Sequence, residues 1–160
     1  MSKPTFRGDY FDRARRVAVA ILVLAAVLGI LGSFLDWIVI TELPPEPEAG
    51  YGGQRTVPYA GVDARDGWIV IGAAVVLLAA TAGLALRRRT AWIAFIASIV
   101  MGAVAFSAYR EVGNLSSAIS RRMDIVGDPE PAIGVALVAI GGVAALLGSV
   151  LGMISSPRAR

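Results

Sequence analysis

Three consecutive arginines, Arg87, Arg88 and Arg89, separate two apolar runs, residues 68–86 and 91–108. On the membrane-insertion scale an arginine at the bilayer centre costs about 2.5 to 3.5 kcal/mol, so no helix carries all three through lipid. The chain must leave the membrane at this arginine turn and re-enter it within a few residues, which makes the flanking segments antiparallel neighbours. Because cytoplasmic loops are rich in arginine and lysine, the turn also orients the other segments.

The composition is that of a membrane protein. The chain has 160 residues, of which 56% are hydrophobic, and a mean hydropathy of +0.69; soluble domains contain about 45 to 50% apolar residues. Four apolar blocks reach the roughly 20 residues that a helix needs to cross a bilayer. We therefore predict an all-α fold, a single polytopic membrane domain (residues 1–160) built as an antiparallel four-helix transmembrane bundle. The predicted spans are residues 17–37, 67–86, 91–109 and 132–154, with outer loops at 38–66 and 110–131.

The charged residues favour one orientation. Ten of the fifteen lysines and arginines lie in the N-terminal arm (residues 1–16), the arginine turn and the C-terminal tail (residues 155–160), whereas ten of the twelve acids lie toward the outer ends of the spans. This bias predicts that both termini are cytoplasmic. The predicted topology anchors are Arg13, Arg15, Arg16, Arg87, Arg88 and Arg89.

The basic arm has two interpretations, nucleic-acid binding and contact with the membrane. Arg13, Arg15 and Arg16 directly precede the first apolar run, which favours contact with anionic lipids at the cytoplasmic face, where each basic residue contributes about 1 kcal/mol. We therefore expect the arm to lie on the membrane surface, and we expect no nucleic-acid partner.

The two outer loops carry signals of local structure. Residues 54–59 are expected to return as a strand beside residues 38–41, with Pro58 confining that strand to a sheet edge. Between them lie a polyproline-type stretch, residues 44–48, and glycine turn positions at 50, 52 and 53. In the second loop an apolar stripe predicts that the third helix continues, or bends along the membrane surface, until residues 127–129. The stripe consists of Val112, Leu115, Ile119 and Met123.

Asp36 and Asp66 are the acids next to spans. Asp36 either binds a proton or cation, or is an interfacial carboxylate beside the belt residue Trp37; its place after nineteen uncharged residues favours the second. Asp66 precedes the second span, where a carboxylate caps free helix N–H groups.

Small residues recur at helical spacing on the third and fourth spans, where they allow helices to approach closely. They either pack within the bundle or form a partner interface, and the fourth span has small residues on more than one face, more than one intramolecular contact requires. The outer end of the first span is likewise narrow, because Gly29, Gly32 and Ser33 have small side chains or none, so a neighbouring helix can approach it closely. The candidate packing and partner-interface residues are Ala94, Ser98, Gly102, Gly141, Ala145, Gly148, Ser149 and Gly152.

The composition argues against several functional classes. The chain has no cysteine and no histidine, which excludes zinc, iron–sulfur and bis-histidine haem sites and catalysis by an imidazole base or a thiolate. Glu42, Glu46 and Glu48 lie in a proline-rich loop that fixes no carboxylate pair, and no glycine-rich phosphate loop leads into a helix. We therefore expect no enzymatic activity and no cofactor or metal.

The chain resembles the small uncharacterised four-helix membrane proteins of actinobacteria. The resemblance rests on the first helix end at residues 32–37 (Gly-Ser-Phe-Leu-Asp-Trp), Asp66-Gly67 before the second helix, the basic turn, and residues 131–134 (Pro-Ala-Ile-Gly) at the fourth helix. Where that pattern often has proline before the tryptophan, this chain has Asp36. The resemblance implies a tetraspan bundle in the plasma membrane and implies no activity.

The sequence therefore predicts a non-catalytic membrane protein, an accessory or structural subunit that packs with other integral membrane subunits or with copies of itself. The alternative is a small transporter or channel-forming oligomer. Intramembrane ionisable residues usually mark transport paths, and the interiors of the four predicted spans contain none, since Asp36 lies at the end of the first.

Overall fold

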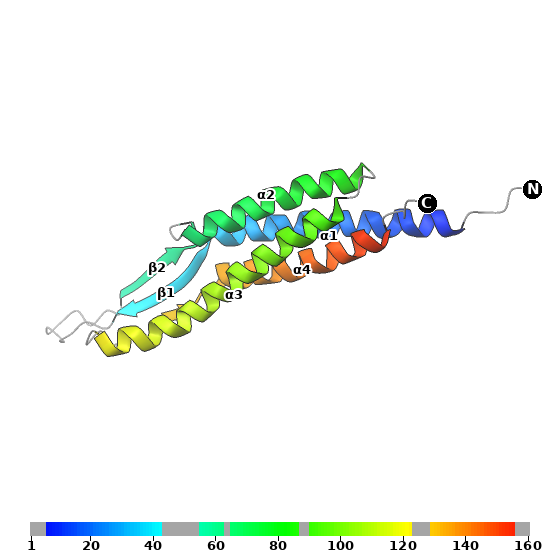
Figure 1. Cartoon of the computed structure of the whole chain (residues 1–160). Coiled ribbons are helices and arrows are strands. Elements are labelled where there is room, and N and C mark those ends of the chain that lie inside the picture. The colour runs from blue at the N-terminus through cyan, green and yellow to red at the C-terminus, as the bar shows by residue number, and fades with distance from the viewer. Residues whose placement is uncertain (1–5, 43–54, 63–64, 87–89, 123–128, 156–160) are drawn as a thin grey trace, which may run out of the picture.

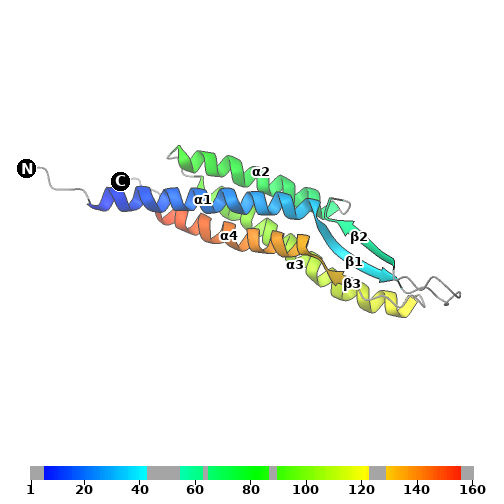
Figure 2. The ribbon, with the colours of Figure 1, turned by 180° about the vertical axis from the view of Figure 1, so that it is seen from behind.

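The computed structural model describes residues 6–42, 55–62, 65–86, 90–122 and 129–155. Its frame is four long helices, α1 (Phe6–Phe34), α2 (Arg65–Ala85), α3 (Ala91–Arg122) and α4 (Ile133–Ser155), which alternate in direction (Figure 1). The first residues of α1 and the last residues of α4 lie at one end of the bundle, and three short strands lie at the other (Figure 2). In the ring of helices α4 packs between α1 and α3, and α2 packs against α1 and α3. The predicted antiparallel pairing of the second and third helices is confirmed.

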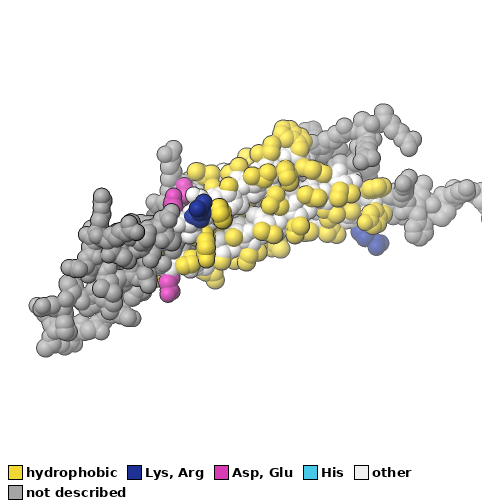
Figure 3. All heavy atoms as spheres, turned by 60° about the horizontal axis from the view of Figure 1, so that its bottom comes forward, with side chains coloured by type: hydrophobic (Ala, Val, Ile, Leu, Met, Phe, Trp, Pro, Cys, Tyr) yellow, Lys and Arg dark blue, Asp and Glu magenta, His cyan; other side chains and the backbone are white. Residues whose placement is uncertain are grey.

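The bundle places small residues inside and large apolar residues outside. Most of its buried core side chains are alanines, with Leu22, Leu77 and Met101 among the few large ones. Large apolar side chains such as Leu24, Ile96 and Ile140 are exposed, and together they form a hydrophobic surface between charged groups at the two ends (Figure 3). A soluble monomer rarely exposes so large an apolar surface, whereas lipid solvates it.

All four helices are long and apolar enough to cross a membrane, so the structure supports a multi-pass membrane protein. The candidate spans contain 20 to 25 residues, or about 30 to 38 Å of helix, which matches a hydrocarbon core of about 30 Å. They are Tyr10–Phe34, Asp66–Ala85, Ala91–Glu111 and Ile133–Ser155.

The first helix differs from its prediction at both ends. It begins at Phe6 and includes most of the basic arm. Within the arm, Arg15 forms a salt bridge of 3.0 Å with Asp12, which precedes it by about one turn. The arm therefore continues the first helix without a break, and its contact with anionic lipids stays a prediction. The helix ends at Phe34, and Asp36 and Trp37 begin a strand instead of closing the helix.

The third helix extends well past its predicted end at residue 109. It continues unbroken to Arg122, which confirms the first of the two alternatives for the second outer loop. Its last turns lie beside the strands, against β3 (Figure 1). The ends of α2 and α4 fall within two residues of prediction, although Asp66 lies in the first turn of α2 and not before it.

A three-stranded antiparallel sheet caps the end of the bundle, an addition to the predicted all-α fold. The strand order is β2 (Arg55–Ala60), β1 (Asp36–Glu42), β3 (Pro129–Pro131), with Ile38 opposite both Tyr59 and Pro131. The predicted return strand is confirmed, and Pro58 lies on an edge strand as expected. β3 was not predicted. Prolines on both edge strands remove N–H donors, which disfavours pairing with another chain.

Backbone bonds join the sheet to the helices. The end of α1 leaves carbonyl groups without helical partners; Val62 N–H donates to Ser33 O at 2.9 Å and Gly61 N–H to Leu35 O at 3.2 Å. On the other side of β1, Ala132 N–H donates to Trp37 O at 2.9 Å. Gly67 N–H, in the first turn of α2, donates to Gly61 O at 3.0 Å. The sheet is thus fixed to α1, α2 and α4 together.

Some sequence predictions lie outside the described residues. These are the polyproline stretch and glycines of residues 44–53, the arginine turn at 87–89, and the tail at 156–160. The side chains of the stripe at 112–123 likewise lie outside the described part of the chain.

Candidate functional site

The small residues of α4 pack against the other three helices of the bundle. A Cβ added to Gly148 would lie 3.0 Å from Ile21 and 3.1 Å from Leu22, and one added to Gly141 would lie 2.9 Å from Ala25 O, all on α1. The prediction of a close neighbour for the slim end of the first span is also confirmed, since a Cβ at Gly32 would lie 2.8 Å from Gly134 O of α4. These contacts make α1 and α4 the most closely packed pair of helices in the bundle.

The other small residues of α4 contact α3 and α2. A Cβ at Gly142 would lie 3.2 Å from the Cα of Gly102, so α3 and α4 cross here almost backbone to backbone. One at Gly152 would lie 2.9 Å from Leu84 of α2. Contacts with α1, α2 and α3 therefore account for the small residues of α4 that the sequence suggested were in excess.

The remaining candidate packing residues are also inside the bundle. Ala94, Ser98, Ala145 and Ser149 are buried, and Gly102 is partly buried at the crossing with Gly142. The sequence left two roles open for these residues, packing within the bundle and contact with a partner. The structure provides contacts for packing within the bundle.

The buried polar side chains are hydroxyls that bond their own helices. Ser98 donates to Phe95 O at 2.6 Å, and Ser149 donates to Leu146 O at 2.8 Å. Ser33, Thr81 and Ser155 make the same kind of bond, and the described residues contain no buried side-chain polar atom without a partner. In this part of the chain no three His, Cys, Asp or Glu side chains form a group that could hold a metal ion. The buried hydroxyl groups of the described residues are therefore already hydrogen-bonded to backbone carbonyls.

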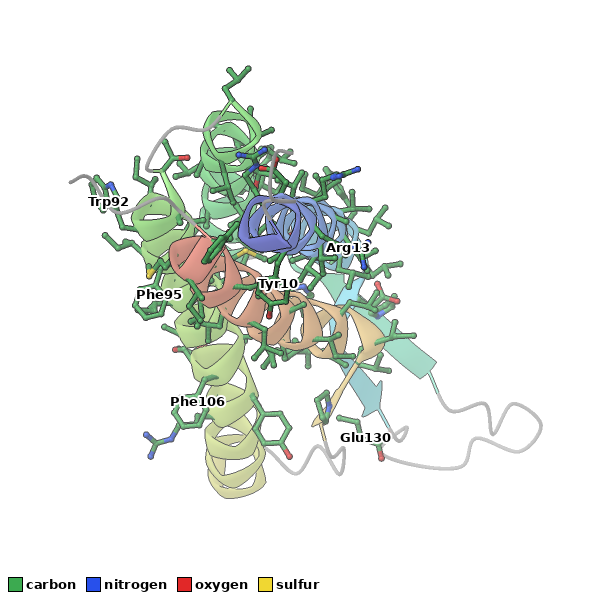
Figure 4. The ribbon with its side chains drawn as sticks, turned by 90° about the vertical axis from the view of Figure 1, so that its right-hand side faces the viewer. Tyr10, Arg13, Trp92, Phe95, Phe106 and Glu130 are labelled. Atoms are coloured by element: carbon green, nitrogen blue, oxygen red, sulfur yellow. The ribbon has the colours of Figure 1, made fainter. Side chains whose placement is uncertain are left out.

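Asp36 and the described anchors lie on the surface. Asp36 is exposed at the start of β1, at the sheet end of the bundle. Arg13 and Arg16 are exposed near the start of α1, at the opposite end, where Figure 4 shows Arg13 beside Tyr10. Charged groups thus flank the apolar surface at both ends.

A groove lies between α3 and α4 in their halves nearest the sheet. It has a volume of about 440 Å³ and an almost wholly apolar lining, within the usual range of ligand sites, about 300 to 1,000 Å³. The lining residues are Gly102, Ala105, Phe106 and Tyr109 from α3, and Pro131, Ala132, Val135, Ala136, Ala139 and Val143 from β3 and α4.

The groove follows from the helix crossing. At Gly102 and Gly142 the two helices are as close as backbones allow, and beyond that point α3 diverges from α4 toward its C-terminal end (Figure 4). The diverging walls carry alanines along much of α4, which are too small to fill the widening space. The sequence pointed to Gly102 as a packing residue but contained no signal for the groove, because the divergence depends on the angle at which α3 crosses α4.

Polar groups lie at the wide end of the groove. The Arg110 guanidinium lies 5.7 Å from the centre of the Phe106 ring, in cation–π range, and Phe106 lines the groove. Glu130 directly precedes the lining residue Pro131 and is exposed. Figure 4, which looks along the bundle, shows Phe106 on α3 and Glu130 on β3 as the two sides of this end. The wide end therefore has a cation on one side and a carboxylate on the other.

Comparison with known proteins adds no relative: no protein-family model matches the chain, and no curated protein matches it.

Proposed function

We propose that this protein is a non-catalytic accessory or structural subunit of a membrane assembly. In this proposal the bundle anchors the chain in the bacterial plasma membrane with both termini cytoplasmic. The sheet and the C-terminal end of α3 then form a rigid domain on the outer side, which we call the head. The head contacts other integral membrane subunits or a second copy.

One observation carries the proposal, the way the head is joined to the bundle. Backbone hydrogen bonds join the head directly to the ends of α1, α2 and α4: Ser33 O of α1 accepts from Val62, Gly67 N–H of α2 donates to Gly61 O, and Ala132, next to α4, donates to Trp37 O. A rigid attachment of this kind suits a subunit that fixes the position of a partner relative to the membrane. The small-residue faces of α4, which suggested a partner site in the sequence, no longer support one because α1, α2 and α3 occupy them.

The interior chemistry is more consistent with this role than with transport. A solute or ion path needs polar groups that are available to the solute, and the buried hydroxyls of the described helices bond their own backbones. An oligomer with a pore between copies is the remaining transport alternative. No observed contact favours it over an accessory role.

The test is the composition of the native particle. The chain, expressed at its natural level, is extracted with its surrounding bilayer into polymer-bounded discs, and the particle mass is measured. We expect a second integral membrane protein, or a second copy, at a fixed ratio. Co-expression of two differently tagged copies separates these two outcomes. A single copy per particle across all conditions would contradict the proposal.

A further inference from the structure

The groove between α3 and α4 opens onto the surface that faces lipid. Phe106, Tyr109 and Val143 line it and are each more than half exposed, at 62%, 61% and 59%. An empty recess would lose the dispersion contacts of these side chains. Water does not replace them, because a bound water needs two to four polar partners and this lining is almost wholly apolar. Hydrocarbon is the occupant that the lining selects.

The shape of the groove favours a thin chain over a helix. The groove runs from Gly102 to Tyr109, about 10 Å along α3 at 1.5 Å per residue. It narrows to the backbone contact between Gly102 and Gly142. A transmembrane helix is about 10 to 12 Å across with its side chains, and it cannot follow the groove to this narrow end. A single acyl chain can lie along its whole length.

The wide end lies at the membrane interface and presents both signs of charge. The span of α3 ends at Glu111, so Tyr109 and Arg110 are at the level of lipid headgroups. At 3.6 residues per turn, Arg110 lies on the flank of α3 next to Phe106, whereas Glu111 lies on the side opposite the groove. Glu130 supplies the carboxylate on the other side of this end.

We propose that the groove binds one bilayer phospholipid with a zwitterionic, ammonium-bearing headgroup. One acyl chain lies along the groove between Phe106 and Val143. The lipid phosphate lies near the Arg110 guanidinium and the Tyr109 hydroxyl, and the ammonium lies near Glu130. This lipid site is separate from the accessory role, and either can hold without the other.

The acyl-chain part is tested by filling the groove. Ala139 is exposed and lines the groove, so Ala139→Phe occupies the recess without entering the bundle core. Ala103 on α3 is equally exposed and lies outside the lining, so Ala103→Phe is the matched control. Native mass spectrometry of the purified wild type should show one retained phospholipid per chain. We expect at least a tenfold loss of this adduct in Ala139→Phe and none in Ala103→Phe.

The headgroup part is tested with two lipids that have identical acyl chains. Delipidated protein is titrated with phosphatidylethanolamine and with phosphatidylglycerol, and the adducts are counted. We expect a severalfold preference for the ethanolamine lipid, which Glu130→Gln should abolish. Arg110→Gln should weaken both lipids, because both carry the phosphate.

Three results would overturn the proposal. The first is an adduct equally abundant in Ala139→Phe and wild type. The second is a preference for the glycerol lipid that Glu130→Gln leaves unchanged. The third is a dimer or a complex with another membrane protein that Ala139→Phe alone dissociates, which would assign the groove to a protein partner. Thermal unfolding of each variant shows whether a lost adduct reflects a lost fold, and in that case Ala136→Leu, at a second exposed lining position, replaces Ala139→Phe.

Discussion

The indole Nε1 of Trp37 donates a hydrogen bond to the carbonyl oxygen of Gly32 at 2.8 Å, joining the start of β1 to the last turns of α1. The side chain is 4% exposed. A Cβ at Gly61 would overlap the indole ring, and one at Gly134 would lie 2.7 Å from it. The orientation of the sheet relative to the bundle therefore depends on one large side chain and on two glycines that make room for it.

Replacing Trp37 should loosen the head. Trp37→Phe keeps most of the ring volume and loses the hydrogen bond, which should cost about 0.5 to 1.5 kcal/mol; Trp37→Ala should cost about 3 to 5 kcal/mol. Thermal unfolding of the detergent-solubilised protein measures both. Trp68→Phe and Trp92→Phe are the controls, because these tryptophans are 63% and 58% exposed. Equal losses in all three phenylalanine variants would contradict a special role for Trp37.

The close packing of α1 on α4 makes Gly148 sensitive to size. Gly148→Leu should overpack the contact with Ile21 and Leu22 and cost about 1 to 3 kcal/mol of stability. Gly72→Leu is the control, since a Cβ at Gly72 would have no atom within 4 Å. A Gly148→Leu variant that keeps wild-type stability and loses only a co-purifying subunit would instead place a partner on this face.

The sequence was most informative where one physical constraint acts alone. Three adjacent arginines cannot remain in lipid, so the α2–α3 hairpin followed from the arginine turn, and the two helix ends that flank this turn were correct within two residues. The edge position of β2 likewise followed from Pro58, which lacks an N–H group. Such local constraints need no knowledge of the neighbouring elements.

Predictions failed where tertiary contacts decide. Asp36 and Trp37 look like the end of a span, but Trp37 finds its partner at Gly32 and its space beside Gly134, so the helix ends at Phe34. β3 contains two prolines and forms only because β1 lies beside it. The small residues of α4 looked excessive because the sequence did not show that α4 packs between two helices. The groove could not be predicted, since it depends on the angle at one glycine crossing.

Thr90 holds the α2–α3 hairpin at the end that carries the arginine turn. Its hydroxyl donates to Ala80 O of α2 at 2.6 Å, while its carbonyl accepts the N–H groups of Ile93 and Ala94 at the start of α3. Interhelical hydrogen bonds in membranes contribute about 0.6 kcal/mol on average and up to about 1.7. Thr90→Val should lose stability in this range when unfolding is measured in detergent, and Thr90→Ser should retain it.

The control for Thr90 is Thr81, whose hydroxyl donates to Leu77 O of its own helix at 2.7 Å. Because that carbonyl belongs to the helical ladder, Thr81→Val should cost less than Thr90→Val. The reverse order would show that the bond between the helices is not what stabilises the hairpin.

Asp36 should be replaceable. It is exposed at the sheet end of the bundle, and its backbone pairs with Ala60. Asp36→Asn keeps the size of the side chain and removes the charge, so thermal stability and particle composition should match the wild type at each pH between 5 and 8. Loss of a proton- or cation-dependent flux in vesicles carrying the variant would restore the transport alternative.

The orientation of the bundle can be read with single cysteines, because the natural sequence contains none. Tyr10 near the start of α1 and Pro58 on β2 are both exposed and lie at opposite ends of the bundle. The excess of basic residues at the Tyr10 end predicts that this end is cytoplasmic. On intact cells a membrane-impermeant thiol reagent should therefore label Pro58→Cys, and should label Tyr10→Cys only after permeabilisation. Labelling of Tyr10→Cys alone would show that the bundle has the opposite orientation. The groove lipid would then lie in the inner leaflet instead of the outer one.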